Sequence, residues 1–161
     1  MEQIKLSSSQ RKILCDLAVV SARKGNLANA GLVLQNGKIL ASAESLVVSD
    51  CNASAHSERM LVEMVGHLRH SNYTPGLTMV SVVEPCTMCM SAVSQAGYKY
   101  LAYIIPAKRY VEKIPWVTDG IKINKERLAS QFSEPLKLVH LSEYEEEFSR
   151  VFEREMKRFL A

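Results

Sequence analysis

The sequence predicts an α/β fold, a three-layer α/β/α sandwich built around a five-stranded mixed sheet. Apolar runs of strand length alternate with longer segments whose apolar residues recur at helical spacing. The first two runs flank Asn36-Gly37, a strong hairpin signal that predicts antiparallel strands. The later runs alternate with helices, an arrangement that predicts parallel strands.

The first half of the chain reads as a helix, a hairpin and a second helix. Ser8 or Ser9 can cap the first helix, and Gly25 ends it. The expected elements are a helix over 7–23, strands over 31–34 and 38–41, a loop over 44–53, and a helix over 55–68.

The second half alternates strands with helices. A β-branched run predicts a central strand, and Pro85-Cys86 is expected to begin the next helix because proline is favoured at a first helical position. Trp116 is interpreted as a packing residue rather than a substrate lid. The expected elements are a strand over 77–83, a helix from Pro85 to Gly97, a strand over 98–105, short helices near 108–113 and 125–132, a strand over 136–141, and an amphipathic helix over 143–159.

Composition sets the broad class. With 161 residues, 47% hydrophobic and 23% charged, the chain is expected to form one globular domain over residues 1–161. A formal net charge of +3 does not demand a nucleic-acid partner. No apolar run reaches the roughly 18 residues of a membrane span, and the N-terminus lacks the apolar centre of a signal peptide. These features predict a cytoplasmic protein without a membrane partner.

Two short motifs point to a metal centre. Cys86 and Cys89 are three residues apart, so one helix face can direct both sulfurs at one ion, and His56 is the best third ligand. Two cysteines and one histidine leave a fourth tetrahedral position open, as in catalytic zinc sites. Glu58, two residues after His56, is then free to carry protons. Cys15 is interpreted as a core residue and Cys51 as a loop thiol rather than a fourth ligand.

His-x-Glu followed by Pro-Cys-x-x-Cys is the signature of zinc-dependent deaminases, and from about Leu14 to Tyr110 the chain resembles the cytidine deaminase-like superfamily. Glu-Pro-Cys-Thr-Met-Cys is most similar to the guanine deaminase and tRNA adenosine deaminase branch. The resemblance implies one Zn²⁺ per chain, parallel fourth and fifth strands, two zinc-bearing helices side by side, and a homodimer. It also implies that Glu58 transfers protons and that the backbone of Ser57 and Glu84 contacts the base.

Three positions depart from the relatives' pattern. Relatives usually have alanine where Ser57 stands, and an asparagine that holds the base or its ribose near the position of Ser45. They also begin the first strand with Pro-Phe-Gly or Pro-Val-Gly, where this chain has Ala28-Asn29-Ala30-Gly31. Asn29 is a candidate to restore the missing amide contact, so Asn29 and Ser45 join the predicted substrate contacts.

The leading hypothesis is a zinc-dependent hydrolase that releases ammonia from a nucleobase or nucleoside, with a purine such as guanine favoured. The alternatives are a deaminase of the cytosine, cytidine or dCMP type, a tRNA adenosine-to-inosine deaminase, and a non-catalytic scaffold stabilised by zinc. The presence of Glu58 argues against the scaffold, because a structural metal does not need it. RNA is possible but not favoured, since only the stretch from Lys108 to Arg127 is mildly basic.

Overall fold

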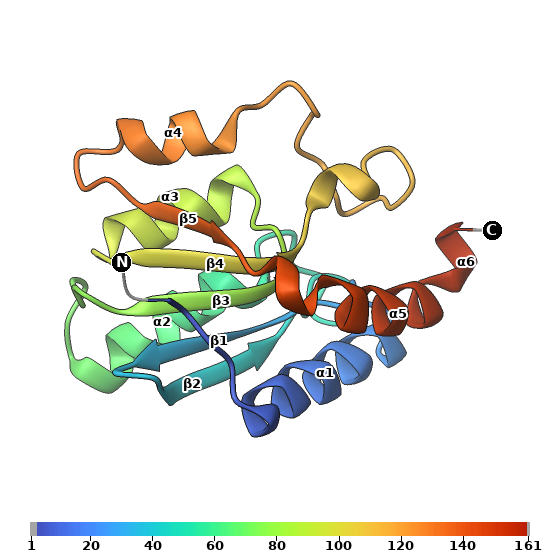
Figure 1. Ribbon diagram of the computed structural model, residues 1–161, viewed down its shortest axis with the longest axis horizontal. Coiled ribbons are helices and arrows are strands. Elements are labelled where there is room, and N and C mark those ends of the chain that lie inside the picture. The colour runs from blue at the N-terminus through green and yellow to red at the C-terminus, as the bar shows by residue number, and fades with distance from the viewer. Residues whose placement is uncertain (1–2, 161) are drawn as a thin grey trace.

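One mixed sheet organises the protein, whose computed structural model describes residues 3–160. Its strand order is β2-β1-β3-β4-β5 (Figure 1). β1 pairs antiparallel with β2 and with β3, whereas β3, β4 and β5 run parallel. The strands are β1 (Ala30–Gln35), β2 (Lys38–Glu44), β3 (Thr78–Val83), β4 (Tyr100–Ile105) and β5 (Lys137–His140). The predicted fold class is therefore confirmed.

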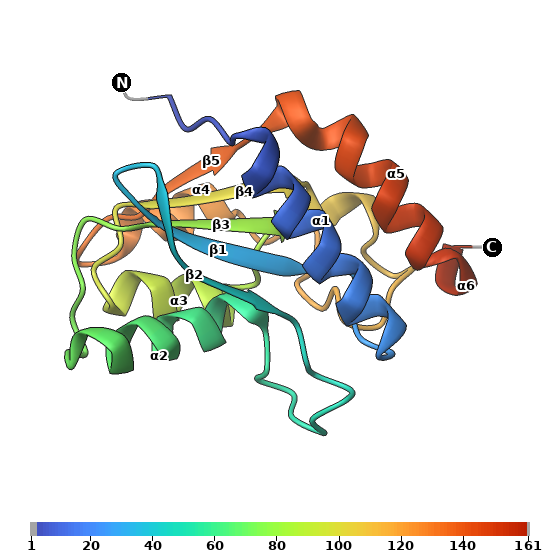
Figure 2. The same cartoon turned by 90° about the horizontal axis from the view of Figure 1, so that it is seen from below.

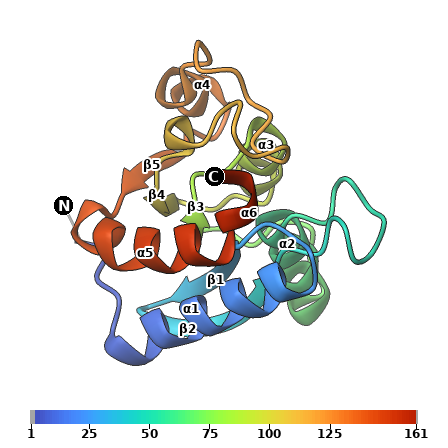
Figure 3. The ribbon, with the colours of Figure 1, turned by 90° about the vertical axis from the view of Figure 1, so that its right-hand side faces the viewer.

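Helices cover both faces of this sheet and give it two hydrophobic cores (Figure 2, Figure 3). Side chains of α1 and α5 fill the core on one face, including the buried Phe148 and Phe152. Side chains of α2, α3 and α4 fill the other, around Leu61, Met90 and Val93. The helices are α1 (Ser8–Arg23), α2 (Ser57–Arg69), α3 (Thr87–Gln95), α4 (Lys125–Gln131), α5 (Glu145–Glu155) and α6 (Lys157–Leu160), with 3-10 turns η1 (Ala107–Arg109) and η2 (Ser142–Tyr144).

The start of the chain agrees with the sequence except at one cap. Asn36 and Gly37 form the hairpin turn with φ of 50° and 74°, so both have the positive φ that this tight turn requires. The α1 cap is Ser7 rather than Ser8 or Ser9. Its hydroxyl accepts from the Gln10 amide while the Gln10 side chain accepts from the Ser7 amide, a reciprocal pair that neither neighbouring serine makes.

Three helix predictions need correction. Pro85 precedes the helix instead of opening it, because Cys86 has an extended backbone and serves as the N-cap residue of α3. The helix expected over 108–113 is only the short turn η1. Tyr110 and Ile114 are drawn into the core, and Glu112 has a φ of 68°, which an α-helix cannot contain. The last helix is divided at Met156, which leaves helical geometry where its sulfur meets the backbone amide of Ala28.

Gly31 sets how closely α2 lies on the sheet. A Cβ atom at this position would stand 2.9 Å from Cδ1 of Leu61 and 3.1 Å from the carbonyl oxygen of Val80. Only a residue without a side chain therefore lets α2 pack this tightly over β1. The first turn of α2, with Ser57 and Glu58, is held against the strands in consequence.

The fold brings both predicted metal-binding motifs to one end of the sheet. His56 is the N-cap residue of α2, and Cys86 is the N-cap residue of α3, just after β3 ends at Val83. Parallel sheets place ligand sites beyond the carboxyl ends of their strands, and this site follows that rule. Among residues 3–160, no helix combines the length and the apolar composition that crossing a bilayer requires.

Candidate metal centre and active site

Three side chains from the starts of α2 and α3 form the candidate metal centre. The ligand atoms of His56, Cys86 and Cys89 all lie within 4.8 Å of one another. Nδ1 of His56 is 3.5 Å from the sulfur of Cys86. Bond lengths of about 2.0–2.3 Å in a tetrahedral zinc site place neighbouring donors about 3.5–3.8 Å apart. The arrangement fits Zn²⁺ with three protein ligands, and the protein binds one zinc ion per chain.

The pKa values of the three ligands depend on one another. The hydrogen bond from the Cys89 thiol, followed by that from His56, lowers the pKa of Cys86 to about 5. The hydrogen bond to Cys86 raises the pKa of His56. The hydrogen bond to Cys86, followed by burial, raises the pKa of Cys89. The unmetallated site thus favours one thiolate, and a divalent ion supplies the charge needed for the second.

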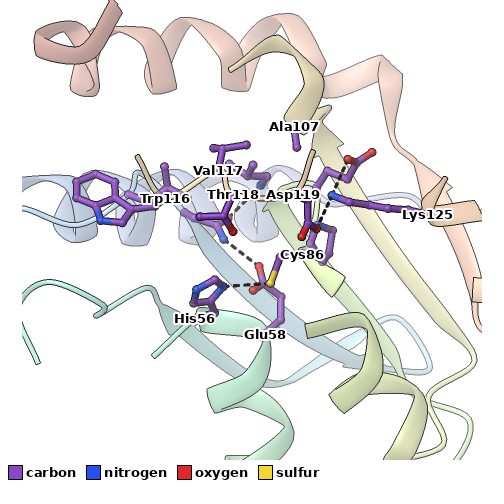
Figure 4. Close-up of a pocket in the computed structure, with 14 residues that line it drawn as sticks. His56, Glu58, Cys86, Ala107, Trp116, Val117, Thr118, Asp119 and Lys125 are labelled. Carbon is purple, nitrogen blue, oxygen red and sulfur yellow. Dashed lines mark hydrogen bonds and ion pairs between the residues drawn. The ribbon is translucent and has the colours of Figure 1, made fainter. Parts of the chain in front are cut away.

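Glu58 lies in the first turn of α2, beside the ligands and almost fully buried at 1% exposure. Its Oε1 accepts a hydrogen bond from Nδ2 of Asn29 at 2.9 Å and another from the Ser57 hydroxyl at 3.2 Å. The Ser81 hydroxyl, in β3, makes a third contact with the same oxygen. A buried carboxylate needs such donors, and these hold Glu58 with its carboxylate beside the metal-binding residues (Figure 4).

A small cavity opens onto the metal centre. Its volume is about 30 Å³, and Asn29, His56, Glu58, Glu84 and Cys86 line it. The opposite wall comes from the segment between β4 and α4: Trp116, Val117, Thr118 and Asp119 (Figure 4). Ligand pockets typically measure about 300–1,000 Å³, so this segment lies close over the site and must shift to admit a ring.

A charged cluster separates this cavity from a second one of about 200 Å³. The ammonium group of Lys125 lies 3.0 Å from Glu84 and 3.4 Å from Asp119, and its side chain is only 9% exposed. Asp119 also accepts hydrogen bonds from the amide of Thr87 at 2.9 Å and from its hydroxyl at 3.3 Å. Asp119 therefore ties the covering segment to the first turn of α3, immediately after Cys86.

The structure divides the predicted substrate contacts into two groups. Asn29 and Glu84 line the cavity, although the Glu84 carboxylate pairs with Lys125. Ser45 and Ser57 are buried behind it, where the Ser57 amide donates to the Ser45 hydroxyl at 3.4 Å. Cys51 is exposed in its loop and outside the ligand cluster.

Sequence reasoning missed several residues of this site. Ser81 could have been found from the sequence, because apart from Thr78 it is the only polar residue in the apolar strand Thr78–Val83. Asp119 and Lys125 had none, since they reach the site through a segment without regular periodicity. Trp116 packs against Phe159 and also lines the cavity. Its ring meets that of Phe159 edge-on, with the centroids 5.2 Å apart.

Comparisons with known proteins agree with this centre. The sequence profile of the family described as "Cytidine and deoxycytidylate deaminase zinc-binding region" matches residues 8–105, which include all three predicted ligands and Glu58. A tRNA-specific adenosine deaminase of Agrobacterium fabrum is 25% identical over 99 residues. That match covers 59% of this chain and 65% of the relative, so the chain spans less than two thirds of the relative's length.

Solved structures share the fold. Guanine deaminase from Nitrosomonas europaea superposes with a TM-score of 0.79 at 14% identity, over 95% of this chain and 86% of the other. A structure from work on A-to-I editing by tRNA:A34 deaminases gives a TM-score of 0.61 at 20% identity, over 81% of this chain and 98% of the other. At these identities the likeness establishes a common fold and leaves the substrate open.

Proposed function

Because the chain belongs to the cytidine and deoxycytidylate deaminase zinc-binding family, whose members are zinc-dependent hydrolytic deaminases acting on C–N bonds, we propose that it releases ammonia from an unphosphorylated aminated purine, with guanine as the first candidate. The observation that carries the proposal is the meeting of His56, Cys86 and Cys89 with the carboxylate of Glu58 at one cavity. A structural zinc would need a fourth protein ligand and no neighbouring acid–base group.

The residues of the site divide the chemistry between them. His56, Cys86 and Cys89 would hold the zinc ion, which would supply a water activated at neutral pH. The oxygen of that water would replace the amine on the ring carbon. Glu58 would accept one proton of the water for delivery to the ring nitrogen and pass the other to the leaving amine, which would depart as ammonia. Trp116 and Val117 form the apolar part of the wall that would exclude bulk water from the reacting ring.

The charges around the cavities favour a substrate without phosphate. Glu58, Glu84 and Asp119 line the first cavity against the single cation Lys125. The second cavity adds Glu126 and Lys108, so carboxylates remain in excess. Phosphate oxygens would be repelled there, whereas carboxylates accept hydrogen bonds from the N–H groups of an aminated purine. This balance disfavours a dCMP-type nucleotide and favours a free base or nucleoside.

The same reasoning disfavours tRNA, which binds through cationic contacts to its phosphates. In the mildly basic stretch 108–127, Arg109 is paired with Glu145 and Glu153, and Lys125 with Glu84 and Asp119. Lys99 and Lys137 lie over the ring of Tyr100 at the start of β4, the end of the sheet opposite to the metal centre. Ion pairs therefore engage two of the six cations in this stretch, which leaves Lys108, Lys113, Lys122 and Arg127 as the groups that RNA would have to use.

We also propose that the protein works as a cytoplasmic homodimer. Val93, in α3, and Ala96, just after it, face the protein's own core and cannot form the contact surface. Adjacent to them, α2 and α3 still expose Met64 at 45%, Leu68 at 57% and Met88 at 38%. A second copy of the chain would cover these side chains.

A substrate panel tests the activity. Ammonia release is measured with zinc-loaded protein on guanine, guanosine, GMP, adenine, adenosine, cytosine, cytidine, dCMP and a tRNA anticodon stem-loop. We expect the highest kcat/KM on an unphosphorylated purine and a large loss when phosphate is added.

Each competing result would contradict a different part of the proposed function. Adenosine conversion only within the stem-loop would favour the tRNA enzyme. A best rate on cytosine or cytidine would contradict the purine assignment alone, and GMP or dCMP as the best substrate would contradict the charge argument. Failure of the zinc-loaded protein to release ammonia from any of them would favour the non-catalytic scaffold.

A further inference from the structure

We propose that Asn29 and Ser81 are positioning residues that fix the catalytic carboxylate of Glu58, with Ser57 as a third support. The inference rests on the proposed function, because it concerns how Glu58 is presented to the reaction. It also changes the role of Asn29, which the sequence suggested as a substrate contact.

All three polar side chains converge on one oxygen of Glu58. Asn29 Nδ2 lies 2.9 Å from Oε1, the Ser57 hydroxyl 3.2 Å from it, and the Ser81 hydroxyl contacts it most closely. The hydrogen bonds from Asn29, Ser57 and Ser81 all end on Oε1 and none of them reaches the other oxygen, Oε2. The Ser81 hydroxyl has one proton and also lies 2.7 Å from the carbonyl oxygen of Val83, so it is shared between the two acceptors. An sp² oxygen has two lone pairs, and the donors from Asn29, Ser57 and Ser81 together saturate Oε1. Oε2 is therefore the oxygen left for proton transfer.

The donors come from three elements whose relative position the fold fixes. Asn29 precedes β1, Ser57 opens α2, and Ser81 lies in β3. The antiparallel register pairs Gly31 with Ser81, which brings the start of β1 alongside the end of β3. All three donors are nearly inaccessible to solvent, so water cannot easily replace a lost hydrogen bond.

The amide of Asn29 is fully engaged in this arrangement. Its Oδ1 accepts from the backbone amide of Val83 at 3.0 Å, and its Nδ2 approaches both Glu58 Oε1 and, at 3.4 Å, the Ser57 hydroxyl. Using the same amide to hold a substrate would break one of these contacts. The geometry favours a fixed strut between β3 and Glu58 over a substrate ligand.

The sequence alone suggested both Asn29 and Ser57 as substrate contacts. In this chain, polar groups at both positions point toward the carboxylate. A buried polar cluster at such positions indicates a local solution for orienting Glu58, because misplacing a reacting group by about 1 Å can cost about a hundredfold in rate.

The test uses Asn29→Ala, Ser81→Ala and the double variant, each loaded with zinc and checked for one metal per chain. On the best substrate of the panel, we expect about a tenfold fall in kcat for each single variant and about a hundredfold fall for the double variant, with KM nearly unchanged. In the Glu58→Gln background, Ser81→Ala should cause no further loss, because its effect passes through Glu58. Ser149→Ala, a buried serine on α5 bonded to Arg109, should leave kcat unchanged.

The split between kcat and KM separates the two roles of Asn29. A rise in KM with an unchanged kcat would make it a substrate contact and overturn the proposal. A further loss from Ser81→Ala in the Glu58→Gln background would also overturn it, since a general structural defect would then explain the effect.

A crystal structure of the double variant keeps the inference testable even if every substrate on the panel fails. We expect the carboxylate of Glu58 to adopt a different rotamer or to lose its single orientation while the metal ligands stay in place. An unmoved Glu58 would overturn the proposal without bearing on which reaction the enzyme performs.

Discussion

Gly31→Ala tests how the sheet holds α2, the helix that carries Glu58, in place. The new Cβ atom would lie 2.9 Å from Cδ1 of Leu61, which is 0.5 Å short of the 3.4 Å at which ordinary contacts begin. Leu61 is fully buried and the second obstacle is the backbone oxygen of Val80, so neither can easily move away. Relief must come from a shift of α2, which carries Glu58.

Two opposing effects set the magnitude. Overpacking a core costs about 1–3 kcal/mol, whereas replacing glycine stabilises by about 0.4–1 kcal/mol through the unfolded chain. The packing cost wins, and the net destabilisation is about 1–2 kcal/mol. For a chain of this size, that lowers Tm by about 2–8 °C.

Thermal unfolding of the zinc-loaded protein measures the effect. Gly120→Ala is the matched control, because a Cβ atom there meets nothing within 4 Å. Its Tm should stay level or rise slightly, and its value isolates the contribution of the unfolded state. A Gly31→Ala protein as stable as Gly120→Ala would refute the close-packing argument.

Three further predictions concern the metal, its supporting helix and self-association. Purified protein should hold about one zinc per chain, and a Cys86→Ala/Cys89→Ala variant that keeps its zinc in elemental analysis would be incompatible with the ligand assignment. Asp119→Ala should destabilise the protein by about 0.5–2 kcal/mol and weaken zinc binding, because α3 loses the carboxylate that accepts from the Thr87 amide. Asp16→Ala, at an exposed aspartate, is the control. Equal denaturation midpoints for the two variants would contradict the capping role of Asp119. Light scattering at micromolar concentration should give the mass of a dimer, which a strictly monomeric mass would exclude.

The sequence was most informative where chemistry is encoded over short distances. Cys86 and Cys89 share one helix turn, and the order of strands and helices follows from periodicity, so the metal ligands and fold class were predictable. The hairpin was equally local, because Asn36-Gly37 adopts the positive φ values that the turn requires.

Features that depend on tertiary packing were not predictable. The helix expected over 108–113 failed because burial of Tyr110 and Ile114 outweighs local propensity. Asp119 caps α3 from 32 positions away, a pairing that no local pattern encodes. Ser81 reaches Glu58 only because of the register between β1 and β3, so its polar side chain in an apolar strand was the sole clue.

The central claim is that Glu58 transfers protons at a zinc-dependent deaminase site. The most direct test compares ammonia release by wild-type and Glu58→Gln proteins, each holding one zinc, on the same substrate. We expect equal zinc content and thermal stability with turnover at least about a hundredfold lower in the variant, the usual scale for a positioned acid–base group. Near-equal turnover of the two proteins would contradict this assignment.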